Sequence, residues 1–443
     1  MSIVIMVGQL ILGLSILVIL HELGHFLAAR AFGIKVEKFY LFFDAWNFSL
    51  FKFTYKGVEY GVGWLPLGGY VKIAGMIDES MDTEQLQGPA QPWEFRSKPA
   101  WQRLIVMLAG IIVNIILGIF IFWMLTLKYG ETYTPLANAH YGVVPGKIGV
   151  KMGLEPGDQI YAVNGIPIKS FEDITKSNVF YDHSELDVLR GTQHLKLTVP
   201  KGILNDLSDD GIDEFIDRDP RSQFMVDSVV AGSNAQKAGL KKGDSILAVN
   251  NNPVPFFDQL QSQLLLNKNK SVQLSIKRNG ELLQLTSNVN SEGKIGFSPK
   301  RDLAIQDTLK YGVLGSLPVG AKKAWSTFTD DAKGLGKLFT GDVKFNKAVS
   351  GPVKIATMFG GHIDWVRFWS LVGILSMVLA LTNLLPIPAL DGGHSLFLLI
   401  EMIKGKPLSD KFLERAQLVG FVLLITLMVF VFGNDIFKLV MKH

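Results

Sequence analysis

The chain has 443 residues, of which 48% are apolar, and its formal net charge is +4. Its mean hydropathy of +0.27 is too high for a wholly soluble protein, and its length allows several domains. The modest, dispersed charge does not favour a nucleic-acid partner. The absence of cysteine excludes disulfides, cysteine-ligated zinc and thiol catalysis. The composition therefore predicts a membrane protein with substantial soluble parts.

The first apolar stretch contains an HExxH motif. Residues 2–20 carry no charge, and the apolar pattern continues through residues 26–29. Side chains four residues apart share one face of a helix, so His21 and His25 can bind one metal ion with Glu22 beside it. The alternative is a signal peptide or a chance pair of core histidines. Residues 1–9 lack the basic region of a signal peptide, which favours a metal site.

Four stretches are long and apolar enough to span a membrane: residues 4–29, 104–127, 368–385 and 417–432. Lysine and arginine are concentrated in the connections after the first and third spans, whereas the N-terminal tail has neither. The positive-inside rule then predicts that both connections are cytoplasmic, and that both termini and residues 128–364 lie outside. HExxH is expected near the cytoplasmic end of its span.

A glycine-rich segment, residues 55–73, lies between the first two spans. It predicts a hairpin of residues 58–64 and 70–73 around a turn that contains Gly68 and Gly69. Such backbone is tolerated at membrane depth where it lines a protein cavity, and an unpaired strand edge there can receive an extended peptide. A surface hairpin in the cytoplasm fits the residues equally well.

The external region contains a repeat. Residues 153–164 and 239–250 share the pattern Gly-Leu-x-x-Gly-Asp-x-Ile-x-Ala-Val-Asn without a gap, which indicates a duplicated domain. The Gly-Asp turn followed by a strand resembles the PDZ domain, and PDZ domains bind extended peptides by strand addition. The alternative is a spacer or steric gate that binds no peptide.

An amphipathic helix with a basic polar side is expected after the repeats. Its apolar positions recur at steps of three and four: Trp325, Phe328, Ala332, Leu335 and Phe339. It is expected to lie on the outer membrane surface or to pack against the repeats, and the glycines at 334 and 336 weaken the case for an unbroken helix.

A third metal ligand is predicted at the end of the third span, because a catalytic zinc site usually has three protein ligands. There, two prolines break the helix before Asp391, and Gly392 and Gly393 allow a sharp turn after it. The topology brings Asp391 to the level of the two histidines. His394 is the competing candidate.

HELGH in a first span together with NLLPIPALDGG in a later one resembles the site-2 protease family of intramembrane zinc metalloproteases. Two PDZ-like domains between the second and third of four spans are similar to its bacterial branch. The resemblance implies a Zn²⁺ cofactor, a catalytic acid/base and a group of residues that hold the substrate. The implied zinc ligands are His21, His25 and Asp391, the acid/base is Glu22, and the substrate-binding residues are Asn383, Asn114, Gly68 and Gly69.

Two segments depart from that family's pattern. Gly110-Ile111 stands where many relatives have Gly-Pro, and Leu41-Phe42-Phe43-Asp44 stands where they have Gly-Phe-Gly. These departures bear on the shape of the cleft rather than on the metal chemistry.

The sequence thus predicts a polytopic α-helical membrane protein with four transmembrane helices, tandem PDZ-like α+β domains and a glycine-rich β-hairpin. The expected function is hydrolysis of transmembrane segments of pre-trimmed single-span proteins. The resemblance implies that these substrates are anti-sigma factors and signal-peptide remnants in a bacterial inner membrane. The alternatives are a membrane PDZ scaffold with a structural or lost metal site, and a metal transporter. The four expected spans lie in segments 1–30, 104–127, 365–390 and 415–443. The two expected cytoplasmic loops are 31–103, which includes the hairpin, and 391–414. The two PDZ-like domains are 128–215 and 216–300, and the amphipathic linker is 301–364.

Overall fold

The computed structural model describes residues 2–66, 68–76, 88–180, 183–302, 304–341 and 351–441. Leu67, in the middle of the expected hairpin turn, lies outside the described residues. The chain forms two compact units, Met1–Gly130 with Lys310–His443, and Glu131–Leu309. Each is described by itself below.

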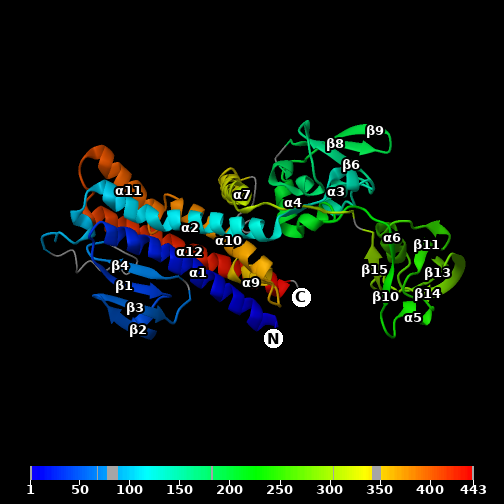
Figure 1. Cartoon of the computed structure of the whole chain (residues 1–443), viewed down its shortest axis with the longest axis horizontal. Helices are drawn as coiled ribbons and strands as arrows, with labels where there is room; N and C mark the ends of the chain where they lie inside the picture. The colour runs from blue at the N-terminus through cyan, green and yellow to red at the C-terminus, as the bar shows by residue number, and fades with distance from the viewer. Residues whose placement is uncertain are drawn as a thin grey trace. The chain divides into compact units, whose positions relative to one another are not determined.

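The first unit is mainly helical. Its helices are α1 (Ser2–Ala31), α2 (Ala100–Tyr129), α7 (Val313–Phe339), α9 (Pro352–Phe359), α10 (Trp365–Leu384), α11 (Asp391–Lys404) and α12 (Asp410–Met441). Four helical segments are long and apolar enough to cross a membrane, as the sequence predicted: Ser2–Ala31, Ala100–Tyr129, Trp365–Leu384 and Lys411–Asp435. Helices α1, α2 and α10 run side by side (Figure 1).

Small residues bring α1 and α2 into close contact. A Cβ added at Gly24 of α1 would lie 2.6 Å from the backbone oxygen of Ala109 and 3.0 Å from the Cα of Gly110 on α2. Only glycine at position 24 allows this approach, which is typical of packed membrane helices. At the start of α2, Arg103 forms an ion pair with Glu401 of α11. These contacts hold α1, α2 and α11 together around one end of α1.

A four-stranded sheet in the order β2-β3-β1-β4 lies beside α1 (Figure 1). Its strands are β1 (Val36–Leu41), β2 (Ser49–Tyr55), β3 (Val58–Gly63) and β4 (Tyr70–Ile73). The expected hairpin of β3 with β4 is wrong, because β1 lies between them, parallel to β3 and antiparallel to β4. Val36 and Tyr40 of β1 are almost fully buried, so β1 takes the central position. The hairpin that does form joins β2 to β3.

Helix α7 is longer than the expected amphipathic segment. It begins at Val313, contains Pro318 and continues through Gly334 and Gly336, which were expected to weaken it. It packs against α2 and α10, where Gly320 lies against the backbone of Trp123 and Ser316 accepts a hydrogen bond from the Trp123 indole at 3.0 Å. These contacts involve residues before the expected apolar positions 325–339, so the position of that segment relative to the membrane surface and the repeats stays a prediction. Small residues at 316, 320 and 324 favour the helix contacts at the start of α7.

The second unit contains two sheets of the same strand order, β7-β6-β8-β9 and β12-β11-β13-β14. The first repeat comprises β5 (Glu131–Tyr133), α3 (Lys147–Lys151), β6 (Gln159–Val163), β7 (Ile166–Pro167), β8 (Glu185–Arg190), β9 (Gln193–Thr198) and α4 (Ile203–Asp210). The second repeat and the segment after it comprise β10 (Phe224–Val229), α5 (Asn234–Lys237), β11 (Ser245–Val249), β12 (Asn252–Pro253), α6 (Phe257–Leu266), β13 (Ser271–Arg278), β14 (Glu281–Asn288), β15 (Phe297–Arg301) and β16 (Asp307–Leu309).

The aspartate of the repeated Gly-Asp turn has the same role in both copies. Asp158 is buried, accepts the backbone N–H of Glu155 at 2.9 Å and pairs with Arg190 at 2.7 Å. Asp244 is fully buried and pairs with Arg278 at 2.7 Å. Each pair joins the turn before the first strand of its sheet to the end of the neighbouring strand. The repeated motif is therefore structural in this unit.

Candidate metal centre

The HExxH motif lies on α1 in the form that the spacing predicts. His21 and His25 are one turn apart and buried, with 8% and 6% of their surfaces exposed. Their ring centroids are 4.8 Å apart, and their Nε2 atoms are 3.3 Å apart. Two imidazoles therefore present the same type of nitrogen to one point inside the helical unit.

Asp391 reaches the same point from the other end of the chain. Helix α10 ends at Leu384, and after the turn that follows it Asp391 is the first residue of α11. Ala389 in this turn has a φ of 77°, in the left-handed region that is rare for alanine. The sharp turn thus precedes Asp391 rather than following it, and Gly392 and Gly393 instead let the first turn of α11 pack against backbone atoms of residues 384–388.

The three ligand atoms form a nearly equilateral triangle. Asp391 Oδ2 lies 3.2 Å from the Nε2 atoms of both His21 and His25, which are themselves 3.3 Å apart. Ligand atoms on a tetrahedral zinc ion with bonds of about 2.0–2.1 Å are about 3.3–3.4 Å from one another. Asp391 Oδ2 is buried and makes no hydrogen bond among the described residues. The spacing and the unpartnered carboxylate oxygen both fit a zinc ion.

Helix α2 forms the wall behind the two histidines. The carbonyl oxygen of Val106 lies 2.8 Å from His25 Nδ1, and the amide of Asn114 lies 3.0 Å from His21 Nδ1. A Cβ added at Gly110 would lie 2.6 Å from His21 Cε1 and even closer to His25 Nε2. The Nδ1 atoms of both imidazoles therefore contact polar groups of α2, whereas both Nε2 atoms lie 3.2 Å from Asp391 Oδ2.

Glu22 faces the edge strand β4. The backbone N–H of Val71 faces the Glu22 carboxylate. A Cβ added at Gly69 would lie 3.6 Å from Glu22 Cγ and only 2.6 Å from both the carbonyl oxygen of Tyr40 and Val18 Cγ1. Gly69 is thus required where the chain enters β4 beside α1. Among the described residues, β4 is an edge strand that pairs with β1, so its other edge carries no strand.

A layer of stacked aromatic rings fixes the start of β4. The rings of Tyr40 and Tyr70 stack at 5.3 Å, and Phe43 stacks on Tyr70 at 6.1 Å. The Tyr70 hydroxyl donates to Asp44 at 2.9 Å, and the Tyr40 hydroxyl donates to Glu59 at 2.7 Å. Burial raises the pKa of both phenols, that of Tyr40 to about 12, so both hydroxyls stay protonated donors at neutral pH.

Of the remaining predicted residues, Asn383 lies at the metal cluster, Gly68 lies near Glu22, and His394 is outside the cluster. Asn383, near the end of α10, is partly exposed, and its Nδ2 lies 3.2 Å from His21 Nε2, at the metal cluster. Gly68 lies against the Phe43 ring, one residue before the contact with Glu22. His394 is not a member of the cluster, which consists of His21, His25 and Asp391 among the described residues.

Sequence reasoning missed three contributors to the site: the Val106 carbonyl, the Val71 amide and Gly110. The first two are backbone groups, which no residue type reveals. Gly110 had a usable signal, because it precedes Asn114 by four residues on the same helix. That spacing is the same as the spacing between the two histidines on the facing helix.

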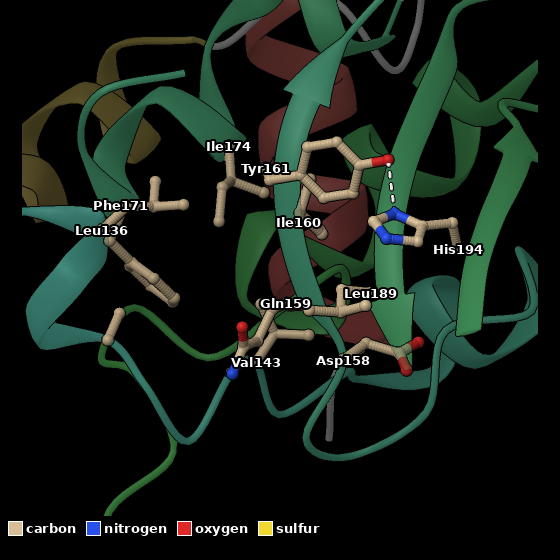
Figure 2. A pocket seen from close by; sticks show the side chains of 12 residues that line it. Leu136, Val143, Asp158, Gln159, Ile160, Tyr161, Phe171, Ile174, Leu189 and His194 are labelled. Atoms are coloured by element: carbon tan, nitrogen blue, oxygen red, sulfur yellow. Dashed lines mark hydrogen bonds between the residues drawn. The ribbon is translucent and has the colours of Figure 1, made fainter. Parts of the chain in front are cut away.

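A separate cavity of about 160 Å³ lies in the first repeat of the second unit. Its wall is mainly apolar, from Val143, Ile160, Phe171 and Ile174 among others, and the Tyr161 hydroxyl bonds His194 Nδ1 at 3.1 Å at its side (Figure 2). Among the described residues that line it, no group of metal ligands such as His21, His25 and Asp391 is found. The cavity fits an apolar side chain rather than a reaction centre.

Comparison with known proteins identifies the family of this chain. The model of peptidase family M50 matches residues 9–427. The chain belongs to peptidase family M50. The "Regulator of sigma E protease" of Haemophilus influenzae is 32% identical over 459 residues, which cover 99% of this chain and 100% of that protein. The "Regulator of sigma-E protease RseP" of Escherichia coli is 31% identical, with 98% of each chain covered.

A Vibrio cholerae protein named for a zinc metalloprotease activity is 31% identical over 97% of this chain. The predicted relationship to site-2 proteases is confirmed, and this M50 peptidase is a metalloendopeptidase. With four helices able to span a bilayer in the described part of the chain, it is a multi-pass membrane protein.

Proposed function

We propose that this M50 peptidase hydrolyses peptide bonds inside membrane-spanning segments, with Zn²⁺ held by His21, His25 and Asp391 and with Glu22 as the catalytic acid/base. The triangle of two Nε2 atoms and one carboxylate oxygen, with sides of 3.2 to 3.3 Å, is the observation that carries the proposal. It includes HExxH residues of a helix that is apolar enough to cross a membrane.

When bound, zinc supplies a polarised water and an electrophilic partner for the scissile carbonyl. Glu22 stands next to His21 on α1 and takes the proton of the attacking water, which it then delivers to the leaving amine. The Asn383 amide N–H, directed toward the cluster, donates to the substrate backbone. Asp391 brings a negative charge that offsets part of the metal charge in a medium of low dielectric.

The outer edge of β4 holds the substrate in an extended form. A helical segment has its carbonyls bonded within the helix, so the segment must unwind before its backbone can be attacked. Strand β4 starts at Tyr70, directly after Gly68 and Gly69, and its Val71 N–H faces Glu22. An unwound segment that pairs with this edge has its backbone beside the acid/base.

The substrates in this proposal are single-span proteins that have already lost their bulky outer domains, such as anti-sigma factors and signal-peptide remnants. The two repeats are PDZ-like domains on the outer side of a bacterial inner membrane. They let trimmed substrates reach the metal cluster and exclude proteins that keep a bulky outer domain. The apolar cavity of the first repeat binds one side chain of an extended peptide. The metal cluster then lies toward the cytoplasm, as the lysine and arginine bias of the loops predicts.

Cleavage and zinc content of the full chain in vesicles test this function. The wild-type chain is expected to bind one zinc ion and to cleave a single-span model substrate that lacks an outer domain. A chain that binds zinc without cleaving any such substrate would favour a scaffold, and metal uptake into the vesicles would favour a transporter. The chain has no cysteine, so single cysteines introduced at Lys241 and at Lys404 report the sidedness by labelling from each face. Labelling of both cysteines from the same face would contradict the predicted placement of the repeats and of the loop after the third span on opposite sides of the membrane.

A further inference from the structure

We propose that α2 is the element that orients both histidines of the metal site, with Asn114 as a positioning residue whose Oδ1 accepts a hydrogen bond from His21 Nδ1–H. The inference rests on the proposed zinc site and goes beyond it, because it assigns a role to a helix that carries no metal ligand. Three positions of α2 carry it: Val106, Gly110 and Asn114. They are four residues apart and therefore lie along one face of the helix.

His25 sets the pattern. Its Nδ1 atom lies 2.8 Å from the carbonyl oxygen of Val106, and both groups are buried. A carbonyl oxygen can only accept, so Nδ1 must carry the proton. The lone pair of the neutral ring is then on Nε2, the atom 3.2 Å from Asp391 Oδ2. The contact with α2 thus selects the tautomer that binds a metal through Nε2.

His21 needs the same tautomer, because its Nε2 also belongs to the triangle. Its Nδ1 atom therefore carries a proton and requires an acceptor. The group within reach is the Asn114 amide, whose Nδ2 lies 3.0 Å from His21 Nδ1 in the structure, while its buried Oδ1 has no hydrogen-bond partner among the described residues. The two ends of an amide are nearly equal in size, so a half-turn keeps the packing and brings Oδ1 to the imidazole N–H. Asn114 has no exposed surface, which suits a group that acts through His21 rather than on substrate.

Gly110 supplies the room for these two contacts. Both rings lie against its Cα, in the space that a Cβ would fill. The backbone of Asn114 is in turn held by α10, since the Ser376 hydroxyl donates to the Asn114 carbonyl oxygen at 2.7 Å. The face of α2 therefore acts as a template that fixes the rotation of both imidazoles before a metal arrives.

Zinc affinity and the visible spectrum of the cobalt-substituted full chain test the inference without reference to cleavage. Asn114→Leu keeps the approximate volume and removes the acceptor, so zinc affinity against a competing chelator is expected to fall about 10- to 100-fold. The cobalt bands are expected to shift, because His21 is free to rotate. Asn114→Asp offers an acceptor to the same proton and is expected to keep the affinity within a few-fold of wild type. Thr126→Val removes another buried polar group of α2, away from the metal cluster, and is expected to change neither readout.

The outcomes separate this inference from the proposed function. Wild-type affinity and an unchanged cobalt spectrum in Asn114→Leu overturn the positioning role. An Asn114→Asp variant as weak as Asn114→Leu overturns the acceptor assignment. A wild-type chain that binds no zinc overturns the proposed function itself, whatever the Asn114 variants do.

Discussion

Replacement of Gly110 by alanine adds one methyl group and is expected to displace the histidines of the metal centre. The added Cβ would lie 2.6 Å from His21 Cε1 and 2.8 Å from His21 Nδ1. Ordinary contacts between such atoms are about 3.5–4.0 Å, so the His21 ring must move by about 1 Å. Metal sites tolerate errors of only about 0.2 Å in ligand distance. The shift is thus several times the tolerance, and zinc affinity is expected to fall by more than about 100-fold.

Gly110→Ala is expected to lower zinc affinity although helix propensity alone predicts that it stabilises α2. Alanine in a helix is favoured over glycine by about 1 kcal/mol, which cannot restore a displaced ligand. The assay is zinc content after dialysis against a graded chelator, on the full chain in detergent. Gly118→Ala on the same helix is the matched control, since its Cβ meets the flexible end of Met377 and the metal cluster is not in contact. Wild-type zinc retention in Gly110→Ala would refute the close approach of α2 to the histidines.

Three further changes probe the rest of the molecule. Glu22→Gln is expected to retain zinc and to lower cleavage by about 10²–10⁴-fold, because it removes the proton acceptor but no ligand; zinc content and cleavage are measured on the same sample. Gly69→Ala is expected to lower cleavage with zinc retained, because its Cβ overlaps the Tyr40 carbonyl and displaces β4 from Glu22. In the second repeat, burial acts to raise the pKa of Asp244, but the hydrogen bonds from Arg278 and from the Lys241 backbone N–H, together with the charges of Arg278 and Lys241, outweigh burial and hold this pKa below its usual value. The pair therefore stabilises the repeat above about pH 4, and the stabilisation is lost as the pH falls through the folded-state pKa, which hydrogen exchange of β11 and β13 measures.

Each of these three predictions has a control or an outcome that would contradict it. A fully active Glu22→Gln contradicts the acid/base assignment. Gly8→Ala in α1 meets nothing within 4 Å and is expected to leave cleavage unchanged, so equal rates for Gly8→Ala and Gly69→Ala would remove β4 from the reaction. Asp244→Asn is expected to abolish the acid-dependent loss of protection in the second repeat. An unaltered pH profile in that variant would assign the loss to other groups.

The sequence predicted the parts of the site that depend on spacing along one helix. HExxH places two imidazoles on one face, and four apolar stretches give the number of spans, so these predictions needed no tertiary information. The pairing of β1 between β3 and β4 was missed because residues 36–41 show no hairpin signal. Their central position follows from burial of Val36 and Tyr40 against other elements. The turn before Asp391 was misplaced because a glycine pair usually marks a turn, whereas here Gly392 and Gly393 serve close packing and Ala389 takes the unusual φ.

The position of Asp391 near the end of the chain has a consequence for biosynthesis. The two histidines enter the membrane with the first helix, but their carboxylate partner is made only after both repeats and the third span. Two imidazoles alone bind zinc weakly and leave its charge uncompensated in the bilayer. An unfinished or truncated chain therefore carries no competent centre. The three proposed ligands are therefore present together only after both repeats have been synthesised.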